Sequence, residues 1–261
     1  MYIEPAMTEI VFEIRDNEQQ RMLQDHFTKF YSTWTPDVQF EGEGEIWHSR
    51  SNIPYPFFNA TFGYSDIDAE IAFFKETPFI WFLDGEGDPE FKEKLLLRGF
   101  QDAGIFQGMI ALLDSNTPLP NVPEGCTLEL VKDEATMQEF SEIVSEIFEL
   151  QGESKDLYKK ALQNNPNLFH WLGRKNGKAV SALSTLIDGN IVSFWNGASL
   201  PESRRQGLAT ALGLLALQDA QTKGCTIATS YLTSEGMALG IATKHGAQTK
   251  WKFHTFISPP N

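Results

Sequence analysis

Three apolar runs that follow one another between residues 169 and 198 limit the folds open to this chain more than any other feature. They cover residues 169–174, 179–187 and 191–198, and turn residues separate them. The first two runs flank Asn176-Gly177, and an Asn-Gly pair between apolar runs is a strong signal for a β-hairpin. An Asp-Gly-Asn turn leads into the third run. We therefore expect an antiparallel meander of three strands.

A long helix follows this meander. Residues 210–222 have helical periodicity, and Gly224 then supplies the residue type favoured just after a helix end. The remaining apolar patterns after residue 125 predict strands at 127–131, 226–231 and 251–257 and helices at 135–150, 155–162 and 234–245. The second half is therefore expected to be an α/β domain built around one sheet.

The clearest boundary in the chain is the proline-rich stretch from Asp114 to Gly125. A length of 261 residues allows one large or two modest domains. We therefore expect an N-terminal domain at 1–114, a linker at 115–125 and a second domain at 126–261. The first half is a mixture of α and β, with helices expected at 17–30, 66–74 and 89–97 and strands at 80–83 and 109–113.

Composition narrows the range of partners. The 35 acidic and 21 basic residues give a net charge of −14, which repels nucleic acid and anionic membranes. Cys126 and Cys225 are far apart and lack the spacing of a metal or redox motif. The N-terminal residues do not resemble a signal peptide, and no apolar run reaches the roughly 20 residues of a membrane span. We expect a cytoplasmic protein without a metal, a nucleic-acid partner or a membrane partner.

The segment from Arg204 to Thr210 joins a predicted strand to a predicted helix. A glycine-bearing turn at such a place exposes backbone N–H groups, and the helix dipole adds to their attraction for anions. Gly207 would let the backbone approach a phosphate closely, while Arg204 and Arg205 add local positive charge in an acidic chain. A ligand with several phosphates, such as coenzyme A, suits this loop.

Residues 200–212 resemble motif A of the GNAT superfamily of acyl-CoA-dependent N-acyltransferases. Arg204, Gly207 and Ala209 match the motif, and so does Pro201 three positions before it. The resemblance extends over residues 126–257. It implies a mixed, largely antiparallel, splayed sheet flanked by helices. It also implies an acetyl-CoA site in which pantetheine meets the backbone of Ala198, Ser199 and Leu200, and pyrophosphate meets the loop Arg204, Arg205, Gln206, Gly207, Leu208, Ala209 and Thr210.

The first half contains a weaker echo of the same family. Residues 95–100, Leu-Leu-Leu-Arg-Gly-Phe, precede a predicted strand and resemble the helix, Gly-Phe turn and final strand that close such domains. This resemblance implies a tandem arrangement with a smaller, degenerate first copy; an unrelated α+β domain is the alternative. No Arg-x-x-Gly-x-Ala loop occurs before the linker, so no cofactor is assigned to this half.

Transfer of an acyl group from CoA to an amine needs an acid that protonates the departing CoA thiolate. The sequence lacks the residue that usually has this role in the family. Many family members place a tyrosine four residues before the glycine of the closing turn, but here that glycine is Gly246 and position 242 is Ala242. Tyr231 at a strand end and Ser234 at the next helix start are substitutes that could lie near the sulfur, and a structural role is the alternative for each. His245 follows on the same predicted helix, where a histidine is ordinarily a partner of the helix dipole.

The residue that would accept the proton of the attacking amine is also not identified by a single motif. Glu146, Glu149 and Glu153 cluster where the family's first helices border the acceptor cleft, and we select Glu149; His170 begins a strand nearby. Ordinary solvated carboxylates are the alternative for each glutamate. The aromatic stretches 53–62 and 73–83 are interpreted as core strands, although the segment around Tyr55 could border the cleft between the halves.

The sequence thus favours an N-acetyltransferase that moves an acetyl group directly from acetyl-CoA to a small-molecule or peptide amine bound between the two halves. Proximity alone supports such a transfer without a strong acid. An acidic cleft would suit a cationic acceptor. A catalytically weak or inactive CoA-binding or sensing module is the alternative, and an interaction protein that keeps only the fold is a third. The motifs of serine hydrolases and P-loop enzymes are absent from the sequence.

Overall fold

The structure is a computed structural model that describes residues 16–35, 37–114, 117–150, 152–163, 165–233 and 246–259. Its described helices are α1 Asp16–Thr33, α2 Ile67–Phe74, α3 Pro89–Leu97, α4 Glu134–Ile147, α5 Glu153–Gln163 and α6 Leu208–Thr222, with short 3-10 turns at η1 Pro56–Phe58 and η2 Pro201–Ser203. The helix expected at 234–245, which carries Ser234, Ala242 and His245, lies outside the described residues.

The described strands form one sheet in the order β1-β2-β3-β4-β11-β5-β10-β9-β8-β7-β6. The strands are β1 Gln39–Glu43, β2 Ile46–Arg50, β3 Ala60–Phe62, β4 Ile80–Asp84, β5 Gln101–Leu112, β6 Cys126–Leu130, β7 Leu168–Lys175, β8 Lys178–Asp188, β9 Ile191–Ser199, β10 Ile227–Thr233 and β11 Gln248–Ile257. Two pairs, β3 with β4 and β9 with β10, are parallel and the other pairs are antiparallel. The expected mixed, largely antiparallel sheet flanked by helices is confirmed.

The meander forms as its turn residues predict. Asn176 and Gly177 take positive φ angles of 50° and 83° between β7 and β8, which is the backbone that a tight hairpin turn needs. Strand β8 then pairs with β9 in antiparallel register. This meander ends at Ser199, directly before the loop of interest.

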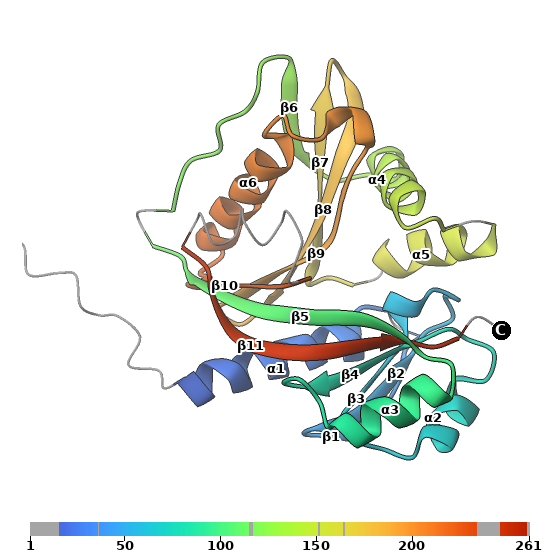
Figure 1. Ribbon diagram of the computed structural model, residues 1–261. Coiled ribbons are helices and arrows are strands. Elements are labelled where there is room, and N and C mark those ends of the chain that lie inside the picture. The colour runs from blue at the N-terminus through green and yellow to red at the C-terminus, as the bar shows by residue number, and fades with distance from the viewer. Residues whose placement is uncertain are drawn as a thin grey trace, which may run out of the picture.

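Each half of the chain contributes its last strand to the other half. Strand β5 ends the first half, yet it pairs with β10, from Leu112 opposite Ile227 to Phe106 opposite Thr233. Strand β11 ends the second half and pairs with β4 as well as with β5. Figure 1 shows β5 in green and β11 in red, side by side between the two groups of helices. The domain limits at residues 114 and 126 stay a prediction, but the pairing makes the two halves share one sheet.

Helices α4 and α6 cover opposite faces of the meander. The side chain of Trp171 in β7 packs with Leu212 of α6, whereas the ring of its neighbour His170 lies 4.8 Å from that of Phe140 in α4. Side chains alternate between the faces of a strand, so the two contacts lie on opposite sides. A Cβ atom added at Gly173 would lie 3.0 Å from Cγ of Leu208. The absence of a side chain there lets the first turn of α6 pack directly on β7.

The other end of the sheet is covered in the same manner. Phe27 of α1 packs on Phe82 of β4 with 5.1 Å between the ring centroids. Trp81, the neighbour of Phe82, is buried on the opposite face in a cluster with Phe74 of α2 and Leu95 of α3. Helix α1 therefore lies on one face of this half, and α2 and α3 lie on the other.

Two features of the first half differ from the sequence expectations. Strands β1 and β2 were not predicted, because residues 39–46 are rich in glutamate and glycine and lack an apolar alternation. The aromatic stretch 53–62 was interpreted as a strand, but only residues 60–62 are extended in the sheet. Pro54 and Pro56 lack the N–H that a strand ladder needs. Residues 56–58 instead form η1, which brings aromatic side chains to the sheet end.

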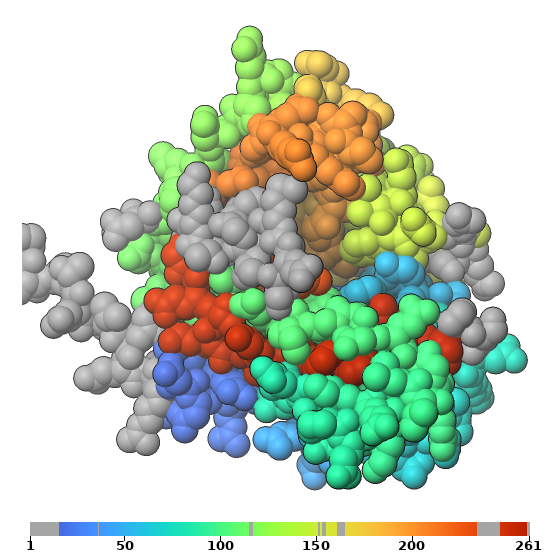
Figure 2. All heavy atoms as spheres, viewed as in Figure 1, coloured from blue at the N-terminus to red at the C-terminus, as the bar shows by residue number. Residues whose placement is uncertain are grey.

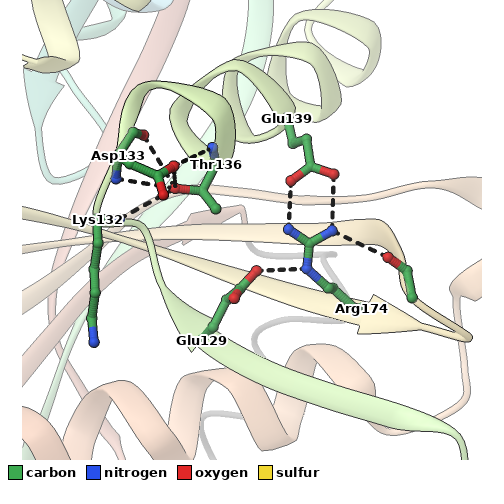
Figure 3. A network of polar contacts seen from close by, with 7 residues as sticks. Glu129, Lys132, Asp133, Thr136, Glu139 and Arg174 are labelled. Atoms are coloured by element: carbon green, nitrogen blue, oxygen red, sulfur yellow. Dashed lines mark hydrogen bonds and ion pairs between the residues drawn. The ribbon is translucent and has the colours of Figure 1, made fainter.

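Polar contacts fix the position of α4 (Figure 3). Asp133 and Thr136 form a capping box at its start, which satisfies helix N–H groups that lack an intrahelical partner. Farther along, the Arg174 guanidinium of β7 donates to both carboxylate oxygens of Glu139 in α4 and to Glu129 in β6. The hydrogen bonds from Arg174 lower the pKa of the Glu139 carboxyl. This clamp ties the helix to two strands.

Replacing Arg174 with methionine is expected to lower the free energy of unfolding by about 1–3 kcal/mol, because two carboxylates lose their hydrogen-bonded partner. Urea unfolding followed by circular dichroism measures the change. Lys178→Met is the matched control, since Lys178 pairs with the single carboxylate of Glu202 and both side chains are exposed, a class of contact worth about 1 kcal/mol or less. Equal losses for the two variants would contradict the role given to the clamp.

Protein stability is expected to fall with acid because of His26 in α1. Burial is the main cause that lowers the pKa of His26 from 6.5 to about 4, with Lys29 lowering it further and Asp188 opposing the shift. Between pH 6.5 and 4, His26 binds a proton in the unfolded chain and stays neutral in the folded chain, so stability falls as the pH falls. The loss reaches about 3 kcal/mol near pH 4. His26→Leu should remove this part of the pH dependence in urea unfolding at pH 7 and 4.5; an unchanged slope would contradict it.

Candidate functional site

The loop from Arg204 to Gly207 presents its backbone to solvent at the start of α6. Gly207 is in the left-handed region, with φ 82° and ψ −7°, and caps the helix that begins at Leu208. Arg205 also has a positive φ, of 60°. The first N–H groups of a helix have no intrahelical partner, and they carry the positive end of the helix dipole. This backbone geometry is of the kind that binds anions, and the assignment of an anion to this loop stays a prediction.

Side-chain hydrogen bonds hold this loop in place. Nε of Arg204 donates to the carbonyl of Ser199 at 3.0 Å, and Nε2 of Gln206 donates to the carbonyl of Glu202 at 2.8 Å. Nζ of Lys175, at the end of β7, donates to Oε1 of Gln206 at 2.6 Å. Lys175 thus adds a third positive charge near Arg204 and Arg205. No local pattern predicts this contact, because Lys175 is 31 residues before Gln206, at the end of another strand.

The sheet opens beside the loop. Strands β9 and β10 run parallel and pair from Ile191 opposite Ile227 to Phe194 opposite Ser230. Their pairing ends there, although β10 continues to pair with β5 as far as Thr233. Asn196 has a φ of 52°, and the register between β8 and β9 shifts at this point. Among the residues that the structure describes, no strand therefore lies beside residues 195–199 of β9 on the β10 side, so this edge can receive an extended ligand.

A cavity of about 790 Å³ joins the loop, the open edge of β9 and a group of aromatic side chains. This volume lies within the range of about 300–1,000 Å³ that is usual for small-molecule sites. Figure 2 shows a hollow in the surface between the orange atoms at the start of α6 and the yellow-green atoms of α4. The cavity draws its walls from both halves of the chain.

The structure brings most of the predicted site residues to this cavity. The predicted residues among its lining are Ala198, Ser199, Arg204, Arg205, Gln206, Gly207, Leu208, Ala209, Thr210 and Tyr231. Leu200 is not brought to the cavity: its side chain is buried, and its amide donates to the carbonyl of Val180 at 2.9 Å. Ser234 lies outside the described residues. The assignment of these residues to cofactor binding stays a prediction.

Tyr231 faces the cavity, but its hydroxyl already has a partner. The hydroxyl donates to the carbonyl of Leu23 in α1 at 2.8 Å. Burial raises the pKa of Tyr231 above its usual value. A phenol with a raised pKa is a weaker acid, and this one would have to break its hydrogen bond before it could protonate a thiolate. The geometry assigns Tyr231 to the wall of the cavity and to the contact with α1.

Glu149 lies outside the lining of the cavity. It is exposed just after α4, in a left-handed conformation with φ 56°. Its charge adds to the effect of burial in raising the pKa of Tyr55, which does line the cavity. Glu149 is thus a neighbour of the cavity wall at Tyr55. His170 is buried against Phe140 and hydrogen-bonded through Nδ1 to the Ser184 hydroxyl at 2.9 Å, and it does not line the cavity.

Most of the aromatic wall was not predicted from the sequence. Apart from Tyr55 and Tyr231, the partly buried aromatic residues that line the cavity come from η1, β5, β9 and the C-cap of α4, namely Phe57, Phe106, Phe148, Phe194 and Trp195. Their positions in apolar runs are typical of core residues, and no local pattern separates an aromatic ring that faces a cavity from one that faces the core. Only the tertiary arrangement brings them together.

Two further observations concern the described part of the chain. It contains no group of three or more histidine, cysteine, aspartate or glutamate residues placed to hold a metal ion. None of its helices is long and apolar enough to cross a membrane.

No family model and no curated protein matches this sequence. Solved structures resemble it over most of its length. A GCN5-related N-acetyltransferase from Kribbella flavida is 16% identical, with 93% of this chain and 96% of that chain covered and a TM-score of 0.62. A functionally unknown conserved protein from Staphylococcus epidermidis is 12% identical, with 85% and 94% covered and a TM-score of 0.64.

A third structure bears on the arrangement in two halves. It is a tandem GNAT protein from the clavulanic acid biosynthesis pathway, 10% identical, with 87% of this chain and 85% of that chain covered and a TM-score of 0.58. The fold of this chain, the separation of β9 from β10 and the loop that caps α6 agree with the resemblance found in residues 200–212. The chain has the fold of the GCN5-related N-acetyltransferase superfamily.

Proposed function

We propose that this protein is an acyltransferase that moves an acetyl group from acetyl-CoA to the nitrogen of an amine. The observation that carries this proposal is the continuity of one cavity from the anion-binding loop, along the open edge of β9, to an apolar chamber between the halves. A ligand with a phosphate end, an extended polar arm and a reactive tip matches that sequence of environments.

Each part of acetyl-CoA has a proposed place. The amides of 205–210 hold the pyrophosphate, with Arg204, Arg205 and Lys175 adding positive charge. The free edge of Ala198 and Ser199 pairs with the amides of the pantetheine arm. The thioester then lies near Asn196, where β9 departs from regular pairing. This places the carbonyl carbon at the entrance of the aromatic chamber.

The reaction is a direct transfer. The amine nitrogen attacks the thioester carbonyl, a C–N bond forms, the C–S bond breaks, and the sulfur leaves as a thiolate. The nitrogen loses one proton and the thiolate gains one through solvent. Holding the two reactants together supplies several kcal/mol of the barrier reduction. Glu149, at the rim beside Tyr55, is the proposed acceptor of the proton through water. We place the reaction in the reducing cytosol, where Cys126 and Cys225 stay free thiols.

Thiol release with acetyl-CoA and a panel of amines tests this proposal. Amine-dependent release of free CoA, with the acetylated amine found by mass spectrometry, is the expected result. Tight acetyl-CoA binding without release across the panel would instead support a CoA-binding or sensing module. The engaged hydroxyl of Tyr231 is the observation that favours that second candidate.

A further inference from the structure

The chamber at the end of the cavity is lined by aromatic rings that keep accessible surface. Tyr55, Phe57 and Phe106 come from the first half, and Phe148, Trp195 and Tyr231 come from the second. All six side chains are partly buried, whereas the core beneath them is fully buried. Aromatic surface that faces a cavity gains free energy when a ligand removes it from water, at about 25 cal/mol per Å². The chamber therefore favours an apolar occupant.

The chamber is also free of the groups that bind cations by charge. Among the described residues that line the cavity there is no aspartate, glutamate, histidine or lysine, and its two charged residues are Arg204 and Arg205 in the phosphate loop. An acidic cleft would have suited a cationic acceptor, but the net charge of −14 does not locate such a cleft. The described carboxylates lie outside this lining: Glu149 is at the rim beside Tyr55, and Glu129 and Glu139 are in the clamp with Arg174.

The walls of the chamber are held in place before any ligand enters. The Tyr31 hydroxyl of α1 donates to the carbonyl of Phe57 in η1 at 3.2 Å. The rings of Tyr55 and Phe148 lie 5.9 Å apart with an interplanar angle of 6°, which joins η1 to the end of α4. A wall that is already ordered loses little conformational entropy when a ligand binds, so it can discriminate between ligands by their shape.

We propose that the acceptor is a primary amine that carries an aromatic ring, with the ring held between Tyr55, Phe57, Phe106 and Phe148 and the nitrogen directed toward the thioester near Asn196. This inference rests on the proposed transferase function. Aromatic pairs add about 0.5–1.5 kcal/mol to the free energy of area burial, so a phenyl ring suits this wall better than an alkyl group of equal size.

The same chamber explains how the amine loses its proton. An ammonium group that moves from water into apolar surroundings has a lowered pKa, so the neutral, nucleophilic amine becomes easier to form. A dication such as putrescine would have to bring a second charge against the aromatic wall, whose described lining holds no carboxylate and whose neighbour Glu149 lies only at the rim, and this is costly. The aromatic wall thus selects against polyamines while it helps to activate an arylalkylamine.

The test measures kcat/KM of the full chain by thiol release with acetyl-CoA and three amines: 2-phenylethylamine, 2-cyclohexylethylamine and putrescine. Acetyl-CoA binding is measured in parallel by calorimetry. We expect kcat/KM for 2-phenylethylamine to exceed that for putrescine by about 100-fold. The cyclohexyl analogue should fall between them, a few-fold below the phenyl compound.

Variants connect the preference to the wall. Phe57→Ala is expected to raise KM for 2-phenylethylamine about tenfold while acetyl-CoA affinity stays within about twofold. Phe73→Ala is the matched control, because Phe73 is also partly buried but stacks on His48 outside the cavity, with 3.8 Å between the rings. It should leave both values unchanged.

The outcomes separate this inference from the proposed function. Absence of acetyl-CoA binding would overturn the function and the inference together. Acetyl-CoA binding with equal or better turnover of putrescine would overturn the acceptor class alone. Turnover that rises more than about tenfold with octanoyl-CoA in place of acetyl-CoA would show that the chamber holds an acyl chain, which also overturns it. Bound acetyl-CoA without turnover of any of the three amines would overturn the acceptor class and favour the sensing module.

Discussion

Gly207→Glu is expected to weaken acetyl-CoA binding by at least about 100-fold, which corresponds to about 2.7 kcal/mol. Gly207 has a φ of 82°, a conformation that costs a residue with a side chain about 1–2 kcal/mol. The glutamate carboxylate would also lie beside the pyrophosphate, where like charges repel. Calorimetric titration of the variant with acetyl-CoA measures the loss.

Gly207→Ala separates the two causes. A Cβ atom at this position would meet only Cγ of Pro123, at 3.9 Å, so space is available and only the backbone strain remains. The alanine variant should therefore lose about tenfold or less in affinity. Equal affinities for wild type and Gly207→Glu would show that the loop does not bind the pyrophosphate.

Phe27→Ala is expected to lower the free energy of unfolding by about 3–5 kcal/mol, the range for removing a fully buried phenylalanine. The ring of Phe27 in α1 contacts rings of both halves, including Phe82 at 5.1 Å and Tyr231 at 4.8 Å. Because the halves exchange β5 and β11, we expect one cooperative transition for wild type and variant. Urea unfolding followed by tryptophan fluorescence and by far-ultraviolet circular dichroism measures it.

Phe79→Ala is the control for position. Phe79 is equally buried, but it packs with Phe74, Trp81 and Phe100 on the face of the sheet that α2 and α3 cover. It should cost a similar amount of stability, since the removed surface is similar. At a temperature where both variants are folded, only Phe27→Ala should weaken acceptor binding, because Phe27 lines the cavity and Phe79 does not. Two separate unfolding transitions in the wild type would contradict the shared sheet.

Local signals predicted much of the secondary structure. Helix α3 covers Pro89–Leu97, the residues expected from its periodicity, and Asp88 caps it with a proline following. Helix α6 begins two residues earlier than expected, at Leu208, because Gly207 itself is the cap. Such features depend on neighbours in sequence, which is why a single sequence reveals them.

The exchange of β5 and β11 was not predictable from the same signals. The run at 109–113 indicated a strand, but β5 extends from Gln101 to Leu112 and its partners are more than a hundred residues away. Periodicity states which face of a strand is buried and says nothing about which strand lies beside it. The polar edge strand β1 was missed for the related reason that its residues 39–43 bury little apolar surface.

The candidate site was predicted in part for the same reasons. The loop 204–210 has a local sequence pattern, and the structure places Arg204 to Thr210 along one cavity. The acceptor chamber has no local pattern, since it combines η1, α4, β5 and β9. Net charge could not locate an acidic cleft, because it is a property of the whole surface, and the described lining of the cavity lacks carboxylates. The loop was therefore predictable from the sequence. The proposed acceptor preference depends on the tertiary arrangement of the chamber.

We expect one binding site for acetyl-CoA per chain, because only the second half has the sequence of the Gly207 loop although both halves build the cavity. Calorimetric titration of the wild-type protein with acetyl-CoA measures the stoichiometry. We predict saturable binding of one acetyl-CoA per chain that Gly207→Glu removes. Two sites per chain, or no binding, would contradict the account.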